Sequence, residues 1–160
     1  MKKSQRNVEV ELQNPNAFDS IPDEKDCQCW TLAAIQTPNQ DLSVVIRFVD
    51  EKESAALNLT YRQKNSATNV LSFPFEMPDI PDLYEERRHL GDLVLCEPVV
   101  ITEAEQQNKS IKQHFAHLIV HGTLHLQGYD HINDDDAEEM ESLEISILES
   151  LGFDNPYESR

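Results

Sequence analysis

The chain has 160 residues, and its 30 acidic against 13 basic side chains give a formal net charge of −17 with histidine neutral. This length suits one domain with its own core, and 39% apolar with 27% charged residues excludes a disordered chain. The sequence has no apolar run long enough for a transmembrane helix and no signal-peptide-like start, and its 3 cysteines form an odd number, so we expect a cytoplasmic protein with reduced thiols.

The first half of the chain predicts two strands and two helices. Apolar residues alternate with polar ones over 8–12, which indicates a strand, and the β-branched run 42–49 indicates a second, central strand. A short helix is predicted over 27–35. A longer helix is predicted from 50 to about 62, with acidic residues in its first turn as the helix dipole prefers.

The middle of the chain predicts two short strands and a third helix. The strands cover 69–73 and 93–96, and the proline-containing segment 76–89 between them is predicted to be a loop. A helix follows over 99–107, with Pro98 at its first position, where a missing N–H costs nothing.

Two further helices have clear end signals. Ser110 and Gln113 form a capping box, and Gly128 ends the helix that this box begins. The last helix begins at the acidic run 134–136 and ends at Gly152. Its apolar stripe consists of Met140, Leu143, Ile147 and Leu151. The chain therefore predicts one α+β domain of residues 1–160, a small mixed sheet of about four strands packed by about five helices.

Histidines gather on one side of the helix that begins after Ser110. At 100° per residue, His114, His121 and His125 point in nearly one direction, beside the apolar stripe of the same helix. His121 and His125 are spaced i and i+4, so both can hold one metal ion. Gly128 lets the chain turn back, so that His131 can supply a third ligand at the end of the helix.

Three imidazoles are a common catalytic zinc shell, because the fourth position stays open for water. Nickel and copper also accept imidazole, so zinc is our choice on abundance alone. Two alternatives remain at this point, a structural metal site and histidines that only pack. His117 is interpreted as a packing residue or as one that supports the ligands.

The histidine spacing equals that of the metzincin peptidases, H-E-x-x-H-x-x-G-x-x-H. Gly122, however, occupies the position of their glutamate general base, and glycine cannot take a proton from a metal-bound water. No methionine turn follows either, because Met140 belongs to the last helix. A zinc peptidase therefore remains the alternative rather than the leading hypothesis.

Three segments resemble the YbeY family of metal-dependent, single-strand-specific endoribonucleases. They are 121–131 (HGTLHLQGYDH), 61–75 (YRQKNSATNVLSFPF) and 90–96 (LGDLVLC), in the family's order and spacing. The resemblance covers about residues 7–152. Asn65 and Ala67 depart from the family's Asp and Pro, and we expect them to alter loop stiffness more than chemistry.

The resemblance implies metal ligation by His121, His125 and His131 and a catalytic role for Arg62. It also implies processing of ribosomal RNA, in particular maturation of the 3′ end of 16S rRNA, and ribosome quality control. The implied partners are single-stranded or ribosomal RNA, the small ribosomal subunit and assembly factors such as the Era-type GTPase. A non-catalytic assembly factor with a structural metal is a further alternative, and we assume a monomer that contacts no membrane.

Arginine suits phosphate chemistry, because its guanidinium is always charged and can contact two oxygens at once. Lys64, Arg87 and Arg88 are candidates for contacts with the RNA backbone, although solvated surface charges explain them equally well. Asp92, His114 and Asp130 are candidates for orienting the ligand histidines, with turn, cap or packing roles as the alternative. The sequence identifies no general base.

The net charge argues against an RNA partner only until the charges are located. Residues 126–160 hold 11 acidic and 1 basic side chain, whereas the other 125 residues hold 19 and 12. The acidic last helix is therefore expected to face away from the RNA groove. A structure with Glu138, Glu141 and Glu144 around the metal would contradict this arrangement.

Overall fold

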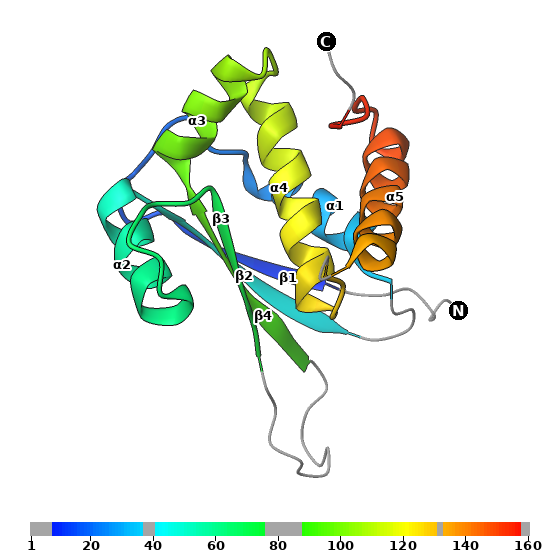
Figure 1. Ribbon diagram of the computed structural model, residues 1–160, viewed down its shortest axis with the longest axis horizontal. Coiled ribbons are helices and arrows are strands. Elements are labelled where there is room, and N and C mark those ends of the chain that lie inside the picture. The colour runs from blue at the N-terminus through cyan, green and yellow to red at the C-terminus, as the bar shows by residue number, and fades with distance from the viewer. Residues whose placement is uncertain (1–7, 37–40, 76–87, 131–132, 158–160) are drawn as a thin grey trace.

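The computed structural model describes residues 8–36, 41–75, 88–130 and 133–157 of the chain (Figure 1). Within them lie four strands, namely β1 (Val8–Gln13), β2 (Leu42–Val49), β3 (Val70–Pro74) and β4 (Arg88–Cys96). Five helices accompany them: α1 (Glu24–Ala34), α2 (Glu51–Arg62), α3 (Glu97–Gln106), α4 (Ile111–Leu126) and α5 (Asp134–Ser150). The predicted α+β class and the approximate numbers of helices and strands are confirmed.

The four strands form one mixed sheet in the order β1-β2-β4-β3. Strands β1, β2 and β4 are parallel, while β3 runs antiparallel to β4, with Ser72 opposite Leu93. A register shift between Ser43 and Val44 leaves Leu90 as an extra residue on β4. Strand β3 is last in this order and pairs with β4 alone, so it is an edge strand. Its outer side faces the site described below.

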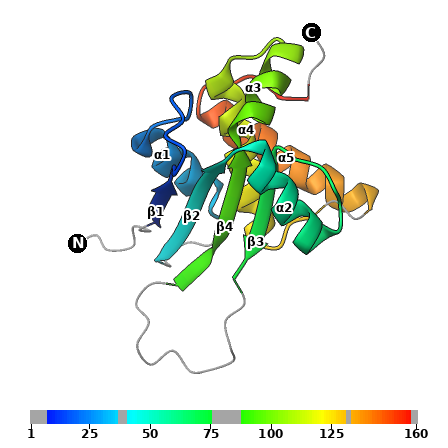
Figure 2. The same cartoon turned by 90° about the vertical axis from the view of Figure 1, so that its left-hand side faces the viewer.

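Helix α4 is the centre of the fold. It contacts α1, α3 and α5 as well as β3 and β4, and Phe115, Ile119 and Leu124 on it are fully buried in the main core. Helix α2 lies on the opposite face of the sheet, where Leu57 packs on a smaller apolar cluster that includes Leu71 (Figure 2). The sheet thus has one face covered by α1 and α4 and one face covered in part by α2.

Side-chain caps explain where several helices begin. Asp23, Asp50 and Ser110 each accept a hydrogen bond from the backbone N–H three residues later, which satisfies an otherwise unpaired donor. The Ser110 cap is as predicted. Helix α5 is capped by Asn133 rather than by the acidic run after it, which occupies the first turn. Gly128 follows α4 with φ +102°, a turn that side-chain-bearing residues rarely adopt.

Several predicted boundaries were wrong by a few residues. Helix α1 begins at Glu24 instead of Cys27, because the cap is Asp23. Strand β4 begins at Arg88, so the end of the predicted loop 76–89 is a strand, and residues 76–87 lie outside the described residues. Pro98 is the second residue of α3 rather than the first. Among the described residues, no helix is both long and apolar enough to cross a lipid bilayer.

Candidate metal and RNA site

Two histidines of α4 meet one turn apart, as their spacing predicts. The Nε2 atoms of His121 and His125 are 3.1 Å apart, and the ring centroids are 4.6 Å apart. Both side chains are half-buried near the C-terminal end of the helix. Their Nε2 atoms therefore converge on one point beside α4.

The opposite nitrogen of each ring is held by a group that can only accept a hydrogen bond. His121 donates from Nδ1 to Glu144 Oε2 at 2.6 Å, and His125 donates from Nδ1 to the Tyr129 carbonyl oxygen at 2.9 Å. Each ring, when neutral, then presents a lone pair on Nε2. Zinc–nitrogen bonds of about 2.0–2.1 Å in tetrahedral geometry separate two nitrogens by about 3.3 Å, so this pair fits a metal ion.

Glu144 is the residue behind His121, and its side chain is fully buried. Besides His121, its carboxylate accepts hydrogen bonds from His117 Nε2 at 2.9 Å and from the Tyr157 hydroxyl. Burial alone would raise the pKa of this carboxyl group, but the donors His117, His121 and Tyr157 outweigh burial and lower the pKa to about 2. A permanent negative charge thus lies behind one imidazole of the pair.

This position of Glu144 corrects the expectation that the acidic helix faces away from the site. Helix α5 turns one carboxylate inward, onto α4, while Glu138 is exposed. The donor atoms of His117, His121 and Glu144 also lie within 4.8 Å of one another, which makes these three a possible metal site among the described residues. The hydrogen-bond distances of 2.9 and 2.6 Å favour Glu144 as the carboxylate that orients His121, an arrangement common behind metal-binding histidines.

Gly122 explains why no general base stands between the two histidines. It faces the sheet, and a Cβ atom there would lie 2.7 Å from Leu93 Cδ2 and 3.2 Å from Ser72 Oγ. The Ser72 hydroxyl donates to the Gly122 carbonyl oxygen at 3.5 Å, which ties β3 to α4. The glutamate of the metzincin pattern has no room at this position.

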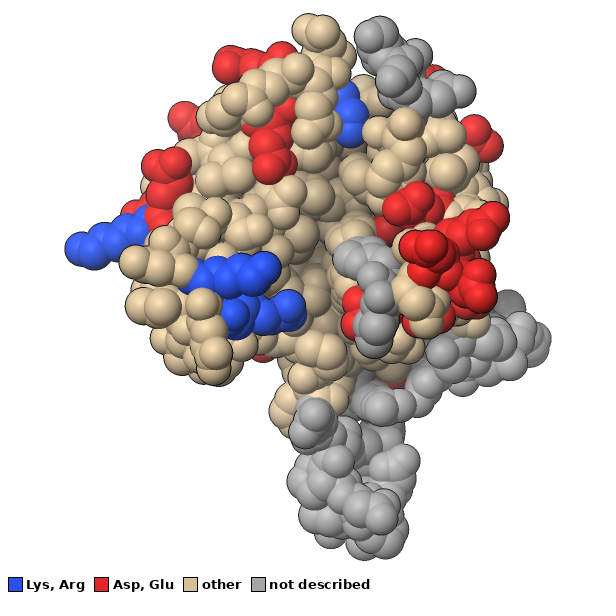
Figure 3. Space-filling view, in the orientation of Figure 1, with Lys and Arg blue, Asp and Glu red and all other residues tan. Residues whose placement is uncertain are grey.

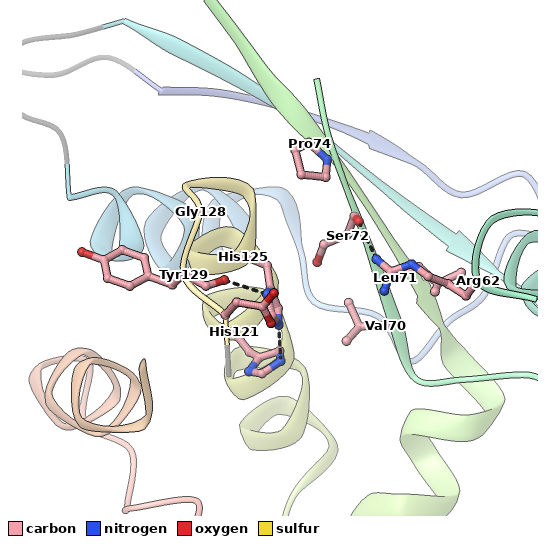
Figure 4. A pocket seen from close by; sticks show the side chains of 10 residues that line it. Arg62, Val70, Leu71, Ser72, Pro74, His121, His125, Gly128 and Tyr129 are labelled. Atoms are coloured by element: carbon pink, nitrogen blue, oxygen red, sulfur yellow. Dashed lines mark hydrogen bonds between the residues drawn. The ribbon is translucent and has the colours of Figure 1, made fainter. Parts of the chain in front are cut away.

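A pocket of about 280 Å³ lies between the histidine pair and strand β3 (Figure 4). Ser72 and Pro74 line its sheet side, and Arg62 lies across the pocket from the histidines. Arg62 Nη2 donates to the Ser72 carbonyl oxygen at 3.2 Å, so the edge of β3 positions the guanidinium. The structure therefore brings four of the predicted site residues to one pocket, namely Arg62, His121, His125 and, at its rim, Asp130.

The remaining predicted residues are placed differently. His131 and Arg87 lie outside the described residues, so their roles stay predictions, and of Arg88 only the backbone, at the start of β4, is described. Lys64 is exposed just after α2, and Asp130 is exposed at the rim of the pocket, lining it beside His125. Their predicted roles also remain open.

Two predicted orienting residues were assigned the wrong partner. Asp92 Oδ1 is 2.9 Å from Nε2 of His89, with both residues on β4, so Asp92 holds His89 rather than a ligand of α4. His114 is buried, and its Nε2 is 2.8 Å from Glu103 Oε1 on α3, away from the pair. Burial lowers the pKa of His114, which makes it a packing histidine.

Charge is distributed unevenly around the pocket. Figure 3 shows basic side chains over the C-terminal end of α2 and acidic side chains over α5, with a hollow between them. A neighbouring hollow of about 490 Å³ is lined by Asp130, Asp136 and Glu139. The α2 side of the site is therefore the one that can approach a polyanion.

Sequence reasoning missed Glu144, Tyr157 and the Tyr129 carbonyl group. A signal for Glu144 existed, because it lies four residues after Met140 and three before Ile147, on the buried stripe of α5. A carboxylate at a buried position requires hydrogen-bond donors. No comparable pattern marked Tyr157 or the Tyr129 carbonyl oxygen.

Comparison with known proteins adds a family and a fold. The sequence model of a family described as Endoribonuclease YbeY matches residues 11–152. Among solved structures, the chain is similar to the solution structure of TM1509 from Thermotoga maritima, with a TM-score of 0.51 and 19% sequence identity. That similarity covers 94% of this chain and 99% of the other, and at this identity it supports the fold alone.

Proposed function

The chain belongs to the YbeY endoribonuclease family, and on this premise we propose that the pocket between α4 and β3 is where it cleaves RNA. Membership makes the protein a metal-dependent endoribonuclease, a hydrolase that acts in ribosomal RNA processing. One observation carries the assignment of the site. Two imidazole Nε2 atoms, each set by an acceptor on the other ring nitrogen, converge at 3.1 Å opposite an arginine.

We propose zinc as the metal, held by His121, His125 and His131. When bound, a divalent metal supplies Lewis-acid chemistry, which lowers the pKa of a water molecule or polarises a phosphoryl oxygen. Glu144 and the Tyr129 carbonyl oxygen fix the two rings so that Nε2 points into the pocket. The buried negative charge of Glu144 also favours a cation at His121.

Arg62 is proposed as the catalytic residue that stabilises the charge developing on the phosphate. One Nη2 contact to the Ser72 carbonyl oxygen leaves other N–H groups of the guanidinium for phosphate oxygens. Because the Ser72 hydroxyl is bonded to Gly122, the arginine and the histidine pair are held by one short chain of contacts. Lys64, Arg87 and Arg88 are proposed to contact the RNA backbone.

The substrate is proposed to be single-stranded. The pocket of about 280 Å³ suits a single unpaired nucleotide, which can turn out of its strand and enter it. In a base-paired helix, pairing holds each nucleotide in the duplex, so its backbone does not enter so small a pocket. Maturation of the 3′ end of 16S rRNA, ribosome quality control, and partnership with the small subunit and an Era-type GTPase are proposed on the motif resemblance. So are a cytoplasmic location and a single domain over residues 1–160.

A peptidase is the weaker candidate, because its general base would stand at position 122, where a Cβ atom would lie only 2.7 Å from Leu93 Cδ2. The test offers the purified protein single-stranded RNA, duplex RNA and unfolded casein, with and without a chelator. Cleavage of single-stranded RNA that the chelator abolishes is expected, and casein cleavage alone would indicate the peptidase. Metal binding without cleavage of any substrate would indicate a structural metal.

Variants locate the activity within the protein. The double substitution His121→Ala, His125→Ala is expected to abolish both metal binding and RNA cleavage. Arg62→Ala is expected to lower kcat by at least about 100-fold while leaving the bound metal unchanged, since it removes one stabilising charge. Lys52→Ala, an exposed cation on the same helix, is the matched control and is expected to have little effect. Unchanged RNA cleavage by the double variant would refute the assignment of the site.

A further inference from the structure

A strip of aromatic side chains lies at the edge of the sheet, from the end of α2 to β3 and the residue that follows it. We call Tyr61, Phe73 and Phe75 the aromatic strip. Tyr61 is 61% exposed and Phe75 is 45% exposed, although both are large rings. Tyr61 packs edge-on against Phe73 at 5.2 Å between centroids, and Phe75 packs edge-on against His89 at 5.3 Å. Both exposed rings are thus held in place by a second ring.

The aromatic strip and the pocket are two sides of the same sheet edge. Alternation along a strand turns Ser72 and Pro74 to the pocket and Phe73 to the other face. Because β3 is the edge strand, a chain leaving the pocket can pass around it without crossing another strand. Arg62, which lines the pocket, follows Tyr61 directly in α2.

Charge decides on which side a polyanion leaves the pocket. On the α5 side it would meet Asp130, Asp136 and Glu139, which line the adjoining hollow. On the α2 side it meets Arg62 and Lys64, and Figure 3 shows basic side chains on one side of the hollow and acidic side chains over α5 on the other. Like charges repel, so the phosphates of a bound strand favour the α2 side.

Among the described residues, the two acidic side chains that line the groove beside the aromatic strip each have a hydrogen-bonded partner. Asp92 is 2.9 Å from His89 Nε2, and Glu53 accepts from Arg47 Nε at 2.7 Å. These groups line or border a groove of about 530 Å³ together with Tyr61, Phe73 and Val94. The groove is thus a largely apolar and aromatic surface whose acids have basic or imidazole partners.

We propose that the aromatic strip is a stacking platform for unpaired nucleotides of the RNA substrate, next to the position of cleavage. The proposal rests on the proposed function, since it takes the pocket as the cleavage site. Aromatic rings accept every base through its π face, so such a platform selects unpaired strands over duplexes without reading sequence. It would extend the substrate footprint beyond the small pocket and along β3 toward Phe75.

The test compares Tyr61→Ala and Phe75→Ala with the unchanged protein on a single-stranded RNA of about 12 nucleotides, a typical length for stacking sites. The dissociation constant is expected to rise about 10-fold for each variant, and kcat at saturating RNA is expected to stay within about 2-fold. For the shortest RNA that the protein still cleaves, the same substitutions are expected to raise the dissociation constant less than they do for the longer RNA. Tyr61→Trp keeps an aromatic ring at this position and is expected to bind the RNA as tightly as the unchanged protein.

Controls separate stacking from simple apolar contact and from loss of folding. Leu59→Ala, on the same helix and 50% exposed, is expected to leave the dissociation constant within about 2-fold. Tyr61→Leu keeps apolar area without a π face, and it is expected to bind as weakly as Tyr61→Ala. Binding by Tyr61→Leu as tight as in the unchanged protein would overturn the proposal, as would equal losses in Tyr61→Ala and Leu59→Ala.

The site and the platform can fail separately. If Arg62→Ala and the histidine double variant lose cleavage while Tyr61→Ala binds normally, the platform is wrong and the proposed site stands. If those variants cleave normally, the site is wrong whatever Tyr61 does. Binding of duplex RNA is expected to be insensitive to Tyr61→Ala, and an equal loss on duplex RNA would contradict stacking.

Discussion

Replacing Gly122 by alanine tests the packing that sets the distance between α4 and the sheet strands β3 and β4. In an exposed helix this change adds about 1 kcal/mol of stability, because alanine restricts the unfolded chain and suits a helix. Here the new Cβ would lie 2.7 Å from Leu93 Cδ2, with Cδ1 of the same side chain only 3.4 Å away. Leu93 is fully buried, so its side chain has little room to move away from the new methyl group.

Overpacking of this kind costs about 1–3 kcal/mol, which exceeds the gain in helix propensity. We therefore expect Gly122→Ala to lower the free energy of unfolding by about 1 kcal/mol. Relief by moving α4 away from β3 would also shift His121 and His125 relative to Arg62. A misplacement approaching 1 Å costs up to about 100-fold in rate, so RNA cleavage should fall at least 10-fold.

Urea denaturation of both proteins measures the first effect, and single-turnover cleavage measures the second. Ser146→Ala, at an exposed position of α5, is the matched control and should gain a few tenths of a kcal/mol from helix propensity alone. A Gly122→Ala protein as stable as the unchanged one, or more stable, would refute the packing argument. Normal cleavage in a destabilised variant would refute only its link to the site.

Three further predictions concern Glu144, the buried thiol of Cys27 and the bound metal. Glu144→Gln should weaken metal binding by about 10- to 100-fold in a calorimetric titration, whereas Glu149→Gln, exposed on the same helix, should leave it unchanged. Burial raises the pKa of the Cys27 thiol from 9.0 to about 12, so the folded protein favours the neutral thiol. The contribution of this thiol to the free energy of unfolding is therefore intact below pH 9. It is lost between pH 9 and 12, by about 1 kcal/mol per pH unit. Urea denaturation at pH 8 and 10 should show that slope diminished in Cys27→Ala. Removing the metal with a chelator should lower Tm in the unchanged protein but not in His121→Ala, His125→Ala, and equal shifts in both would contradict the proposed ligands.

Local signals were enough to predict most of the fold. The Ser110 cap acts within one helical turn, and strand β2 is marked by its own β-branched run, so neither depends on distant residues. Strand β4 was predicted too short because His89 and Asp92 face the partly covered side of the sheet and are polar. Only pairing with β2, set by distant sequence, shows that residues 88–92 are a strand.

The site shows the same division between local and distant information. His121 and His125 share a helix, so their spacing alone placed them together. Glu144 and Tyr157 reach the pair only because α5 packs on α4, and no spacing rule connects them to it. The prediction for Asp92 failed for the same reason, since its strand turns it toward His89.

The packing of α4 on the sheet links Gly122, which departs from the metzincin pattern, to Arg62, the residue proposed to contact phosphate. Strand β3 lies close to α4 because Gly122 has no side chain, and this closeness lets Ser72 bond to the helix. The carbonyl group of the same Ser72 then holds Arg62 across from the histidines. A glutamate at position 122 would collide with Leu93 of β4 and crowd Ser72 of β3, so α4 would have to move away from the sheet edge that holds Arg62. A glutamate between the two histidines is therefore not compatible with the packing that holds Arg62, and Arg62 lies where the proposed contact with a phosphate needs a fixed positive charge.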